Sequence, residues 1–370
     1  MRIIYLYPSL AVWGGIERIL VDKMNFLVSR YGYDVYMVTS DQGEHPVPYH
    51  LDERVHLIDL DICFYTRYRY KGIQRIKEYQ RMSRLYQERL CGLLQEIKPD
   101  VMVCTTSQNV KQLLKLKGHI PLVVESHVNF SHPDTLTQQL RTFFNNYWIG
   151  KAEAVVILTD GDAEDWRRVS RQVHVIPNIV SLNDANQYSD YTSKRVLFVG
   201  RFADQKGIGE LFGIWQRVHP KFPDWNLDLY GEGELWEKYK HEAKTMNMNI
   251  NLHKPTSQIF EVYRHSSVFV LTSVYEPFGL VMPEAMSCGL PVVAFDCPHG
   301  PACIITEGED GFLIPDRDHQ KFADKLCLLM ESLELRQQMG KKAIDSSKRF
   351  TAKEIMPMWK QLFEHLASLS

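Results

Sequence analysis

The chain has 370 residues, with 43 Lys and Arg against 45 Asp and Glu, and 45% of its residues are hydrophobic. These proportions are typical of a folded globular protein and exclude a disordered, collagen-like or disulfide-stapled chain. Because a single hydrophobic core stops growing at about 250–300 residues, the length predicts two domains. The net charge of −2 gives no overall attraction to nucleic acid or anionic lipid.

The cysteines are dispersed and form no Cys-x-x-Cys pair of the kind that zinc sites and redox motifs use. A reducing, cytoplasmic compartment is therefore expected. Apolar runs are of strand length, far below the ~20 residues that a membrane-spanning helix needs. The first apolar stretch ends at Pro8 without a small-residue cleavage site, so we expect no signal peptide.

In the first half, short runs of β-branched and aromatic residues alternate with longer segments of helical apolar spacing. We predict strands at residues 3–7, 35–39, 101–105, 122–125 and 155–158. Buried-looking strands that alternate with helices predict a parallel sheet covered by helices.

The second half repeats this pattern after a linker. Residues 177–193 are rich in Asn, Asp, Ser and Tyr and carry no periodic apolar face, so we place the domain boundary there. Strands are predicted beyond it at 195–199, 227–230, 268–272 and 291–295. The sequence thus predicts an α/β protein of two doubly wound, Rossmann-like domains, 1–178 and 190–351.

The tail from Thr351 predicts an amphipathic helix that could pack on either domain. Its apolar stripe consists of Ile355, Trp359, Leu362, Phe363 and Leu366.

The segment 268–289 carries the first candidate site. A buried strand ends in a loop that holds Glu276 and Gly279, and a helix is expected to begin near Leu280. Helix N-termini at the carboxyl edge of a parallel sheet hold anions through free N–H groups. Glu276, together with Glu284 about one turn into the helix, could accept hydrogen bonds from the hydroxyls of a sugar and a ribose. An N-terminal helix glutamate beside an unrelated surface glutamate is the alternative.

The strand at 195–199 runs into a glycine-containing loop with Arg201 and Lys206. A planar guanidinium and a mobile ammonium at one strand end can neutralise a diphosphate, including the charge that grows as it departs. Two solvated surface cations are the alternative. The expected position at the same sheet edge as the Glu276 loop favours the functional interpretation.

Gly14 and Gly15 follow the first strand and open a helix. Paired glycines let a backbone approach a phosphate closely, and the helix start supplies N–H donors. His127 should emerge at the same sheet edge, where it could bond a sugar hydroxyl or donate to a leaving oxygen. A loop histidine with structural partners is the alternative. Neither this loop nor the one at Gly231 and Gly233 completes G-x-G-x-x-G, so a dinucleotide site is poorly supported.

Together these segments resemble the family 4 glycosyltransferases, whose GT-B fold has two Rossmann-like domains facing a central cleft. The similarity is densest over residues 195–315. It is carried by the E-x7-E motif from Glu276 to Glu284, by Gly200-Arg201-Phe202 with Lys206-Gly207, by Gly14-Gly15-Ile16-Glu17 and by Ile176-Pro177-Asn178.

The resemblance implies a nucleotide-sugar donor and a role for each candidate. Glu276 would bond hydroxyls of the donor sugar, Glu284 those of the ribose, and His127 would contact the donor sugar or the acceptor. The groups that would meet the diphosphate are Arg201, Lys206, Phe278, Gly279 and Gly15, and Gly14 and Leu280 are further donor-binding candidates. Glu276, His127, Arg201 and Lys206 are therefore the catalytic candidates.

The same resemblance implies retention of the anomeric configuration, with the departing phosphate assisting the acceptor's proton loss. No protein nucleophile is then required, which agrees with the lack of an activated nucleophile beside a base in this sequence. The first domain would bind the acceptor, and residues 352–370 would form a helix that crosses back onto it. No metal ion and no cofactor are implied.

Two positions depart from the family pattern. Cys303 stands where an acidic residue is common, and Lys254 replaces a frequent glycine. Both would lie near the donor pocket and bear on base and sugar preference. Related sequences with a segment like the one at 297–301 often act in bacterial surface polysaccharide synthesis with UDP-linked hexoses, which favours a UDP donor.

Competing functions remain open. Asp59-Leu60-Asp61 and Asp316-Arg317-Asp318 imitate the D-x-D motif that holds a divalent cation in the other large glycosyltransferase fold, although such tripeptides are common by chance. A nucleotide-sugar 2-epimerase would share the architecture and need no acceptor. A non-catalytic sugar-nucleotide-binding protein is disfavoured, because a pure binder does not need cations on a leaving group.

Residues 67–89 are strongly basic, with eight Arg and Lys against Glu78 and Glu88, and tyrosines are interleaved with them. On a helix this stretch could lie against anionic lipid headgroups, where a lipid-linked acceptor would be presented. A solvated helix face is the alternative. Nucleic-acid binding is disfavoured because the patch stands alone in a net-acidic protein.

The sequence therefore predicts a retaining, metal-independent transferase. It would move a hexose or N-acetylhexosamine from a nucleotide sugar to a glycan or lipid-linked acceptor in bacterial surface polysaccharide synthesis, such as that of lipopolysaccharide or capsule. We expect it in the cytoplasm, with peripheral contact on the inner face of the membrane as an open question.

Overall fold

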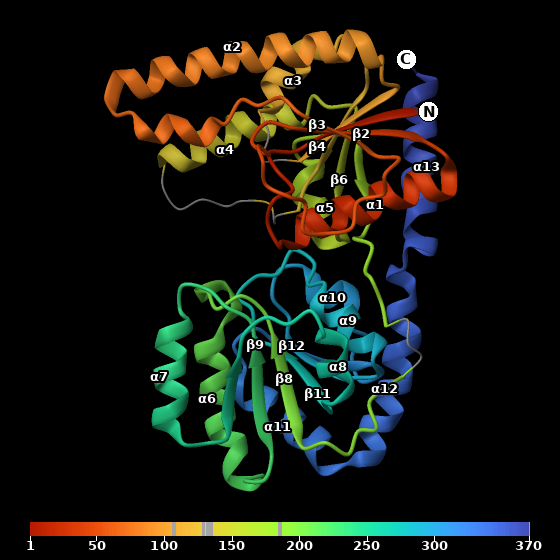
Figure 1. Cartoon of the computed structure of the whole chain (residues 1–370). Helices are drawn as coiled ribbons and strands as arrows, with labels where there is room; N and C mark the ends of the chain where they lie inside the picture. The colour runs from red at the N-terminus through yellow and green to blue at the C-terminus, as the bar shows by residue number, and fades with distance from the viewer. Residues whose placement is uncertain (106–108, 128–129, 131–135, 184–186, 370) are drawn as a thin grey trace. The chain divides into compact units, whose positions relative to one another are not determined.

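The computed structural model describes residues 1–105, 109–127, 130, 136–183 and 187–369 (Figure 1). They form two compact units, an N-terminal unit of Met1–Ile179 with Ile355–Ser370 and a C-terminal unit of Val180–Glu354. Each unit contains one open, all-parallel sheet flanked by helices (Figure 1). This confirms the predicted fold class of two doubly wound α/β domains.

The N-terminal unit has a sheet in the order β3-β2-β1-β4-β5-β6-β7. Its strands are β1 Arg2–Leu6, β2 Asp34–Thr39, β3 His56–Asp59, β4 Val101–Thr105, β5 Leu122–Glu125, β6 Ala154–Ile157 and β7 Val173–Val175. Its helices are α1 Gly15–Tyr31, η1 Phe64–Arg69, α2 Gly72–Ile97, α3 Val110–Leu116, α4 Leu136–Ile149, α5 Asp160–Arg167 and α13 Ala352–Ser368. After β1 the chain adds β2 and β3 on one side of it and then continues with β4 on the other side. This change of side places a topological switch point between the carboxyl ends of β1 and β4.

The C-terminal unit has a sheet in the order β10-β9-β8-β11-β12-β13. Its strands are β8 Arg195–Val199, β9 Asn226–Tyr230, β10 Ile250–His253, β11 Val268–Leu271, β12 Val292–Phe295 and β13 Gly311–Ile314. Its helices are η2 Asp204–Lys206, α6 Ile208–Val218, η3 His219–Lys221, α7 Trp236–Met246, α8 Ile259–Arg264, α9 Val281–Ser287, α10 Gly300–Ile304, α11 His319–Glu331, α12 Leu333–Ser347 and η4 Lys348–Phe350. Here the order reverses between β8 and β11, so the loops after these two strands meet at the switch point.

All nine predicted strands are present, and four further strands lie outside the prediction. β3, β7, β10 and β13 are the outer strands of the two sheets. An outer strand is covered on fewer sides and needs a less apolar sequence, so its pattern is weak. β7, for example, is a three-residue strand whose residues are all half-buried.

The predicted tail helix is confirmed as α13, and the five residues of its apolar stripe are buried. From Ile355 onward it belongs to the N-terminal unit. The division of the chain between Ile179 and Val180 falls within the predicted linker. Apart from 184–186, which lie outside the described residues, the linker contains no helix or strand.

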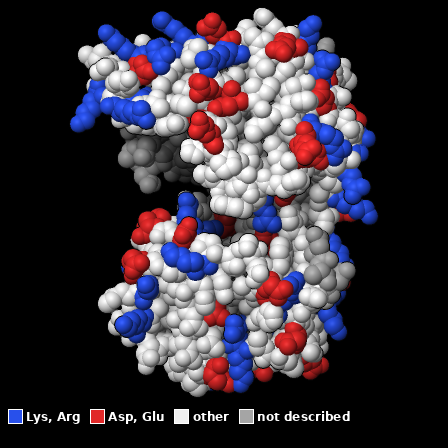
Figure 2. Space-filling model, in the orientation of Figure 1, with Lys and Arg blue, Asp and Glu red and all other residues white. Residues whose placement is uncertain are grey.

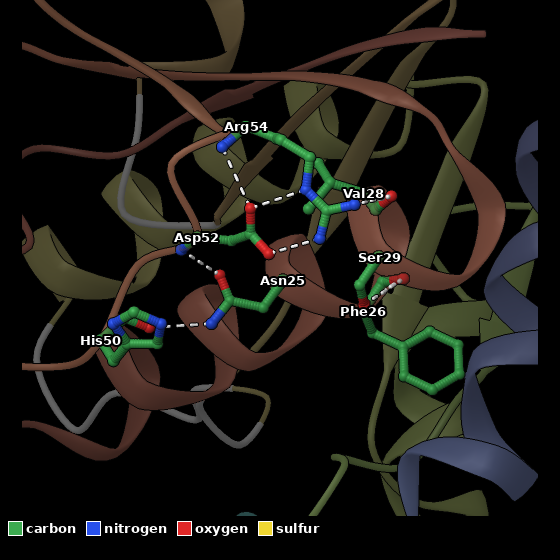
Figure 3. A network of polar contacts seen from close by, with 7 residues as sticks. All are labelled: Asn25, Phe26, Val28, Ser29, His50, Asp52 and Arg54. Atoms are coloured by element: carbon green, nitrogen blue, oxygen red, sulfur yellow. Dashed lines mark hydrogen bonds and ion pairs between the residues drawn. The ribbon is translucent and has the colours of Figure 1, made fainter.

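The loop between β2 and β3 is tied to α1 by a network of polar contacts (Figure 3). The amide side chain of Asn25 donates to the His50 carbonyl at 2.8 Å and accepts from the Asp52 amide at 2.8 Å. Arg54 binds the Asp52 carboxylate through Nε at 2.8 Å and Nη2 at 2.6 Å. Because Asn25 bonds the backbone at both His50 and Asp52, this part of the loop is held against α1, the helix that begins at Gly15.

None of the helices within the described ranges combines the length and the apolar character needed to cross a bilayer.

Candidate active site

The switch point of the C-terminal unit is built from the loops after β8 and β11. Lys206 is the last residue of η2, and Gly207 follows it with φ +60°. A Cβ atom on Gly207 would lie 2.1 Å from the Thr272 carbonyl oxygen, so only glycine permits this approach of the two loops. The Thr272 hydroxyl lies 3.2 Å from the Lys206 carbonyl and 3.0 Å from that of Gly207. The backbone that carries Lys206 is therefore fixed to the end of β11.

This arrangement brings Lys206 and Glu276 together. The Lys206 ammonium forms an ion pair with Oε2 of Glu276, to which the Ser273 hydroxyl also donates at 3.1 Å. The side chains of Lys206 and Glu276 are 15% and 9% exposed. A cation and a carboxylate that are largely removed from water interact more strongly than exposed charges do. The cluster can therefore bind a phosphate oxygen and a sugar hydroxyl within a few ångströms of each other.

The backbone of Glu276 is held by the loop after β12. Its amide donates to the Pro298 carbonyl at 2.7 Å, and its carbonyl accepts from the Gly300 amide at 2.7 Å. These contacts explain the position of the Cys297-Pro298-His299-Gly300-Pro301 segment, which supports the Glu276 loop from the neighbouring strand. Sequence patterns alone did not link the two segments.

The helix predicted to begin near Leu280 is confirmed, since Leu280 is the N-cap of α9. The backbone amides of Phe278, Gly279 and Leu280 donate no hydrogen bond to another residue in the part of the chain that is described. Glu284 lies in the first turn, 5% exposed, and accepts from the Tyr263 hydroxyl at 3.1 Å. Glu276 and Glu284 therefore have different surroundings, one beside a cation and one beside a phenol.

Arg201 lies on the same loop as Lys206 but is exposed, and its side chain makes no hydrogen bond or ion pair with any residue that the structure describes. The backbone beside Arg201 is fixed at the next residue, where the Phe202 amide donates to the Glu232 carbonyl at 2.9 Å. The structure thus joins Lys206 with Glu276 and leaves the Arg201 guanidinium available.

In the N-terminal unit, Gly14 is the N-cap of α1 and Gly15 its first residue. A Cβ atom on Gly14 would lie 2.0 Å from Oε2 of Glu17. Glu17 also accepts from the Tyr7 hydroxyl at 2.9 Å, and the Tyr49 hydroxyl donates to the Gly14 carbonyl at 3.0 Å. Tyr49 therefore fixes the Gly14 carbonyl, and the Glu17 carboxylate occupies the space that a Cβ atom on Gly14 would need, at the carboxyl edge of β1.

His127 follows β5, and its side chain is 4% exposed. Its Nε2 lies 3.0 Å from Oε2 of Glu125, which forms an ion pair with Lys23 of α1. Sequence reasoning identified His127 and missed both partners. The available signal was a lysine among the apolar residues of α1, since Lys23 is buried between Leu20 and Met24.

Burial alone would raise the pKa of Glu125, but Lys23 and His127 outweigh it and lower the pKa to about 2. A carboxyl group with a depressed pKa stabilises the fold fully above its unfolded pKa, here 4.5, and loses that contribution as the pH falls towards 2. We therefore expect the free energy of unfolding to fall between about pH 4.5 and pH 2, and to fall less steeply in a Lys23→Met/Glu125→Leu variant. Urea titrations of the wild type and the variant at pH 5 and pH 3 measure how far the free energy of unfolding of each falls. An equal fall in both proteins would contradict the depressed pKa of Glu125.

The D-x-D tripeptides have other partners. The Asp59 carboxylate accepts from the Thr39 hydroxyl and from the Gly43 amide, each at 2.9 Å. Asp318 is the N-cap of α11 and accepts from the Lys321 amide at 2.9 Å. Within the described ranges, no group of three or more His, Cys, Asp or Glu side chains is arranged to hold a metal ion. Asp59 and Asp318 thus have clear structural roles.

Comparison with known proteins matches nearly the whole chain to two glycosyltransferase models. The model described as Glycosyltransferase Family 4 matches residues 13–184, and that described as Glycosyl transferases group 1 matches residues 183–346. An uncharacterized glycosyltransferase of Haemophilus influenzae is 27% identical over 94% of this chain and 95% of its own. The amylovoran biosynthesis glycosyltransferase AmsD of Erwinia amylovora is 27% identical over 98% and 99%.

A solved structure gives the same answer for the fold. A variant of TarM from S. aureus, solved with fondaparinux, α-GlcNAc-glycerol and UDP, superposes with a TM-score of 0.78 at 16% identity, covering 98% of this chain and 99% of that one. Both halves of the chain therefore match glycosyltransferase models, and the fold agrees over nearly its full length. The chain belongs to the family 4-type glycosyltransferases and has their GT-B fold.

Proposed function

We propose that this glycosyltransferase moves a hexose or N-acetylhexosamine from a UDP-sugar, with retention at the anomeric carbon, to a glycan or lipid-linked acceptor of a bacterial surface polysaccharide. The observation that carries the proposal is the cluster of Lys206, Glu276 and Ser273 at the switch point of the C-terminal sheet. AmsD is named for amylovoran biosynthesis and TarM was solved with UDP, which supports this donor and this kind of product.

In this proposal the donor displaces part of the Lys206–Glu276 contact. Lys206 and Arg201 take the diphosphate oxygens, with the free amides of Phe278, Gly279 and Leu280 beside them. Glu276 then turns its carboxylate to a hydroxyl of the sugar. Glu284, held by Tyr263, takes the ribose hydroxyls.

The transfer step needs no protein nucleophile. The acceptor oxygen bonds to the anomeric carbon on the face from which the diphosphate leaves, and the carbon–oxygen bond to the phosphate breaks. The acceptor's proton passes to the departing phosphate oxygen. Lys206 and Arg201 stabilise the charge that grows there, so their contribution is larger in the transition state than in the bound donor.

A thermal-shift panel of UDP-, GDP- and ADP-sugars, followed by product analysis with the best binder, tests the proposal. We expect a UDP-sugar to raise the melting temperature most and UDP to be released only when an acceptor is present. Interconversion of UDP-sugars without acceptor would favour the 2-epimerase. Binding without any UDP release, across a panel of polysaccharide and lipid-linked acceptors, would favour a non-catalytic binder.

We also propose that turnover needs no metal ion, because Lys206 and Arg201 supply the positive charge that a cation supplies in D-x-D enzymes. Turnover in an excess of EDTA should therefore equal turnover in buffer. A loss that added Mg²⁺ or Mn²⁺ restores would contradict this proposal.

The basic stretch predicted from the sequence is exposed on η1 and the first half of α2. Lys and Arg side chains gather at this end of α2 (Figures 1 and 2). Ile73 and Ile76 lie among them at 74% and 59% exposure, and Tyr68 is 62% exposed beneath the guanidinium of Arg75, 5.2 Å from its ring. The second half of the helix is anchored in the core by Met82, Tyr86, Leu90, Leu94 and Ile97.

Exposed aliphatic and aromatic side chains among cations suit the interface of an anionic bilayer. We propose that this surface presents the enzyme to a lipid-linked acceptor. Flotation with vesicles containing anionic phospholipid should recover the wild type, and charge reversal at Arg75, Lys77, Arg81 and Arg84 should abolish recovery. Reversal of four exposed cations of the C-terminal unit is the matched control, at Lys238, Lys240, Lys341 and Lys342. Equal flotation of both variants would overturn the membrane proposal.

A further inference from the structure

The buried pair of Lys23 and Glu125 is not used by the donor site described above. Lys23 projects from the middle of α1, is 2% exposed, and lies over the Trp359 ring at 4.3 Å from its centroid. Its only hydrogen-bond partner among the described residues is Glu125, whose side chain is 3% exposed. A full charge of each sign is thus enclosed in the N-terminal unit, next to the end of β5.

Stability alone explains this pair poorly. Removing two charges from water costs several kcal/mol each, and apolar residues of similar size often replace a buried pair without loss. Burial lowers the pKa of Lys23, and the nearby Glu125 opposes that shift. The pair differs from an isolated ion pair because Glu125 has a second partner. The carboxylate oxygen that binds Lys23 also lies 3.0 Å from Nε2 of His127.

This contact decides which nitrogen of His127 carries the proton. A carboxylate can only accept a hydrogen bond, so Nε2 must be the donor. In the neutral imidazole, Nδ1 then has a free lone pair. Nδ1 is also buried and has no hydrogen-bond partner within the described part of the chain. An acceptor atom in this state, on a side chain that is 4% exposed, is costly unless a ligand supplies a donor.

We propose that Lys23 and Glu125 are positioning residues, which hold His127 with its proton on Nε2 so that Nδ1 accepts a hydrogen bond from a hydroxyl of the donor sugar or of the acceptor. The inference rests on the proposed function through the role of His127. The sequence left two roles open for His127, bonding a sugar hydroxyl or donating a proton to the leaving oxygen, and the tautomer decides between them. Neutral Nδ1 has no proton to give, so His127 binds a hydroxyl and does not protonate the leaving oxygen. Lys23 neutralises Glu125, and the three groups together carry no net charge.

The state of His127 can be read in the wild-type protein. Nitrogen-15 spectra of histidine-labelled protein separate protonated from unprotonated ring nitrogens, and the His127→Ala variant identifies the signals. We expect a protonated Nε2 and an unprotonated Nδ1, with the Nδ1 signal shifting when the UDP-sugar and acceptor are added together. A proton on Nδ1 with a bare Nε2 would overturn the proposal.

Variants test whether the pair acts through His127. Lys23→Met/Glu125→Leu removes both charges with side chains of similar length and leaves Nε2–H of His127 without its acceptor, so the melting temperature should fall by only a few degrees. Turnover should fall about 10- to 100-fold, the range found when the group that orients a metal-binding histidine is replaced. The same two changes made in His127→Ala should cause no further loss, because residues that act as one unit are not additive.

A further loss of the same size in the His127→Ala background would show that the pair acts elsewhere, and would overturn the proposal. Normal turnover of His127→Ala would also overturn it, and would leave the donor site intact if the UDP-sugar still raised the melting temperature. Should the double variant not fold, the tautomer measured in the wild type still decides the question.

Discussion

Replacing Lys206 by Ala should lower turnover about 100-fold or more, because in the proposed function the ammonium stabilises charge that develops on the departing diphosphate. Affinity for UDP should fall as well. Lys206 is 15% exposed, and its removal leaves the Glu276 carboxylate without a cation beside the proposed phosphate site. The variant therefore loses an attraction and acquires a repulsion. Steady-state kinetics and calorimetric titration with UDP measure the two effects.

Glu276→Ala separates the two halves of the ion pair. Turnover should again fall about 100-fold or more, since the sugar loses its carboxylate partner. Affinity for UDP should hold or rise, because Lys206 no longer shares its charge with Glu276. UDP affinity that falls in Lys206→Ala and holds or rises in Glu276→Ala would show that both side chains act at the same donor site. Parallel losses of UDP affinity in both variants would indicate that the pair only supports the loop.

Lys341→Ala is the matched control for a lost positive charge. Lys341 is an exposed residue of α12 in the same unit. Its replacement should leave turnover and UDP affinity unchanged. If the turnover of Lys206→Ala were as close to that of the wild type as the turnover of Lys341→Ala, the role assigned to Lys206 would be refuted.

The second large effect is on stability. Gly207→Ala should lower the free energy of unfolding of the C-terminal unit by about 3 kcal/mol or more. The residue has φ +60°, and the added Cβ would lie 2.1 Å from the Thr272 carbonyl oxygen. The atom that must move is backbone at the end of β11, so it cannot relax by a rotamer change. Separation of the loops would also part Lys206 from Glu276, and turnover should fall with stability.

Gly213→Ala is the matched control for Gly207→Ala. Gly213 lies inside α6, and nothing lies within 4 Å of its added Cβ. Alanine is the better helix former, so stability should hold or rise by up to about 1 kcal/mol. Urea unfolding of both variants checks the pair of predictions. A Gly207→Ala protein as stable as the wild type would mean that the loops are not held at this distance.

Local patterns predicted much of the fold because the central strands are buried on both faces and read as continuous apolar runs. The start of α9 at Leu280 could likewise be predicted, since it depends on the strand, loop and helix signals of one segment. The outer strands could not, because half-covered strands such as β7 need no apolar run. The structure also shows that the Asp59 and Asp318 carboxylates serve a loop and a helix cap, which their D-x-D spacing does not reveal.

The sequence by itself determined the two parallel sheets, the family and the positions of Glu276, Glu284, Arg201 and Lys206 along the chain. Only the tertiary structure decided which charges meet. Lys206 and Glu276 are 70 residues apart and Lys23 and Glu125 are 102 apart. Strand order brings Lys206 and Glu276 together, because they follow the neighbouring strands β8 and β11. Lys23, in the middle of α1, reaches Glu125 at the end of β5 through the packing of a helix. Both are properties of the folded domain, not of the spacing between residues.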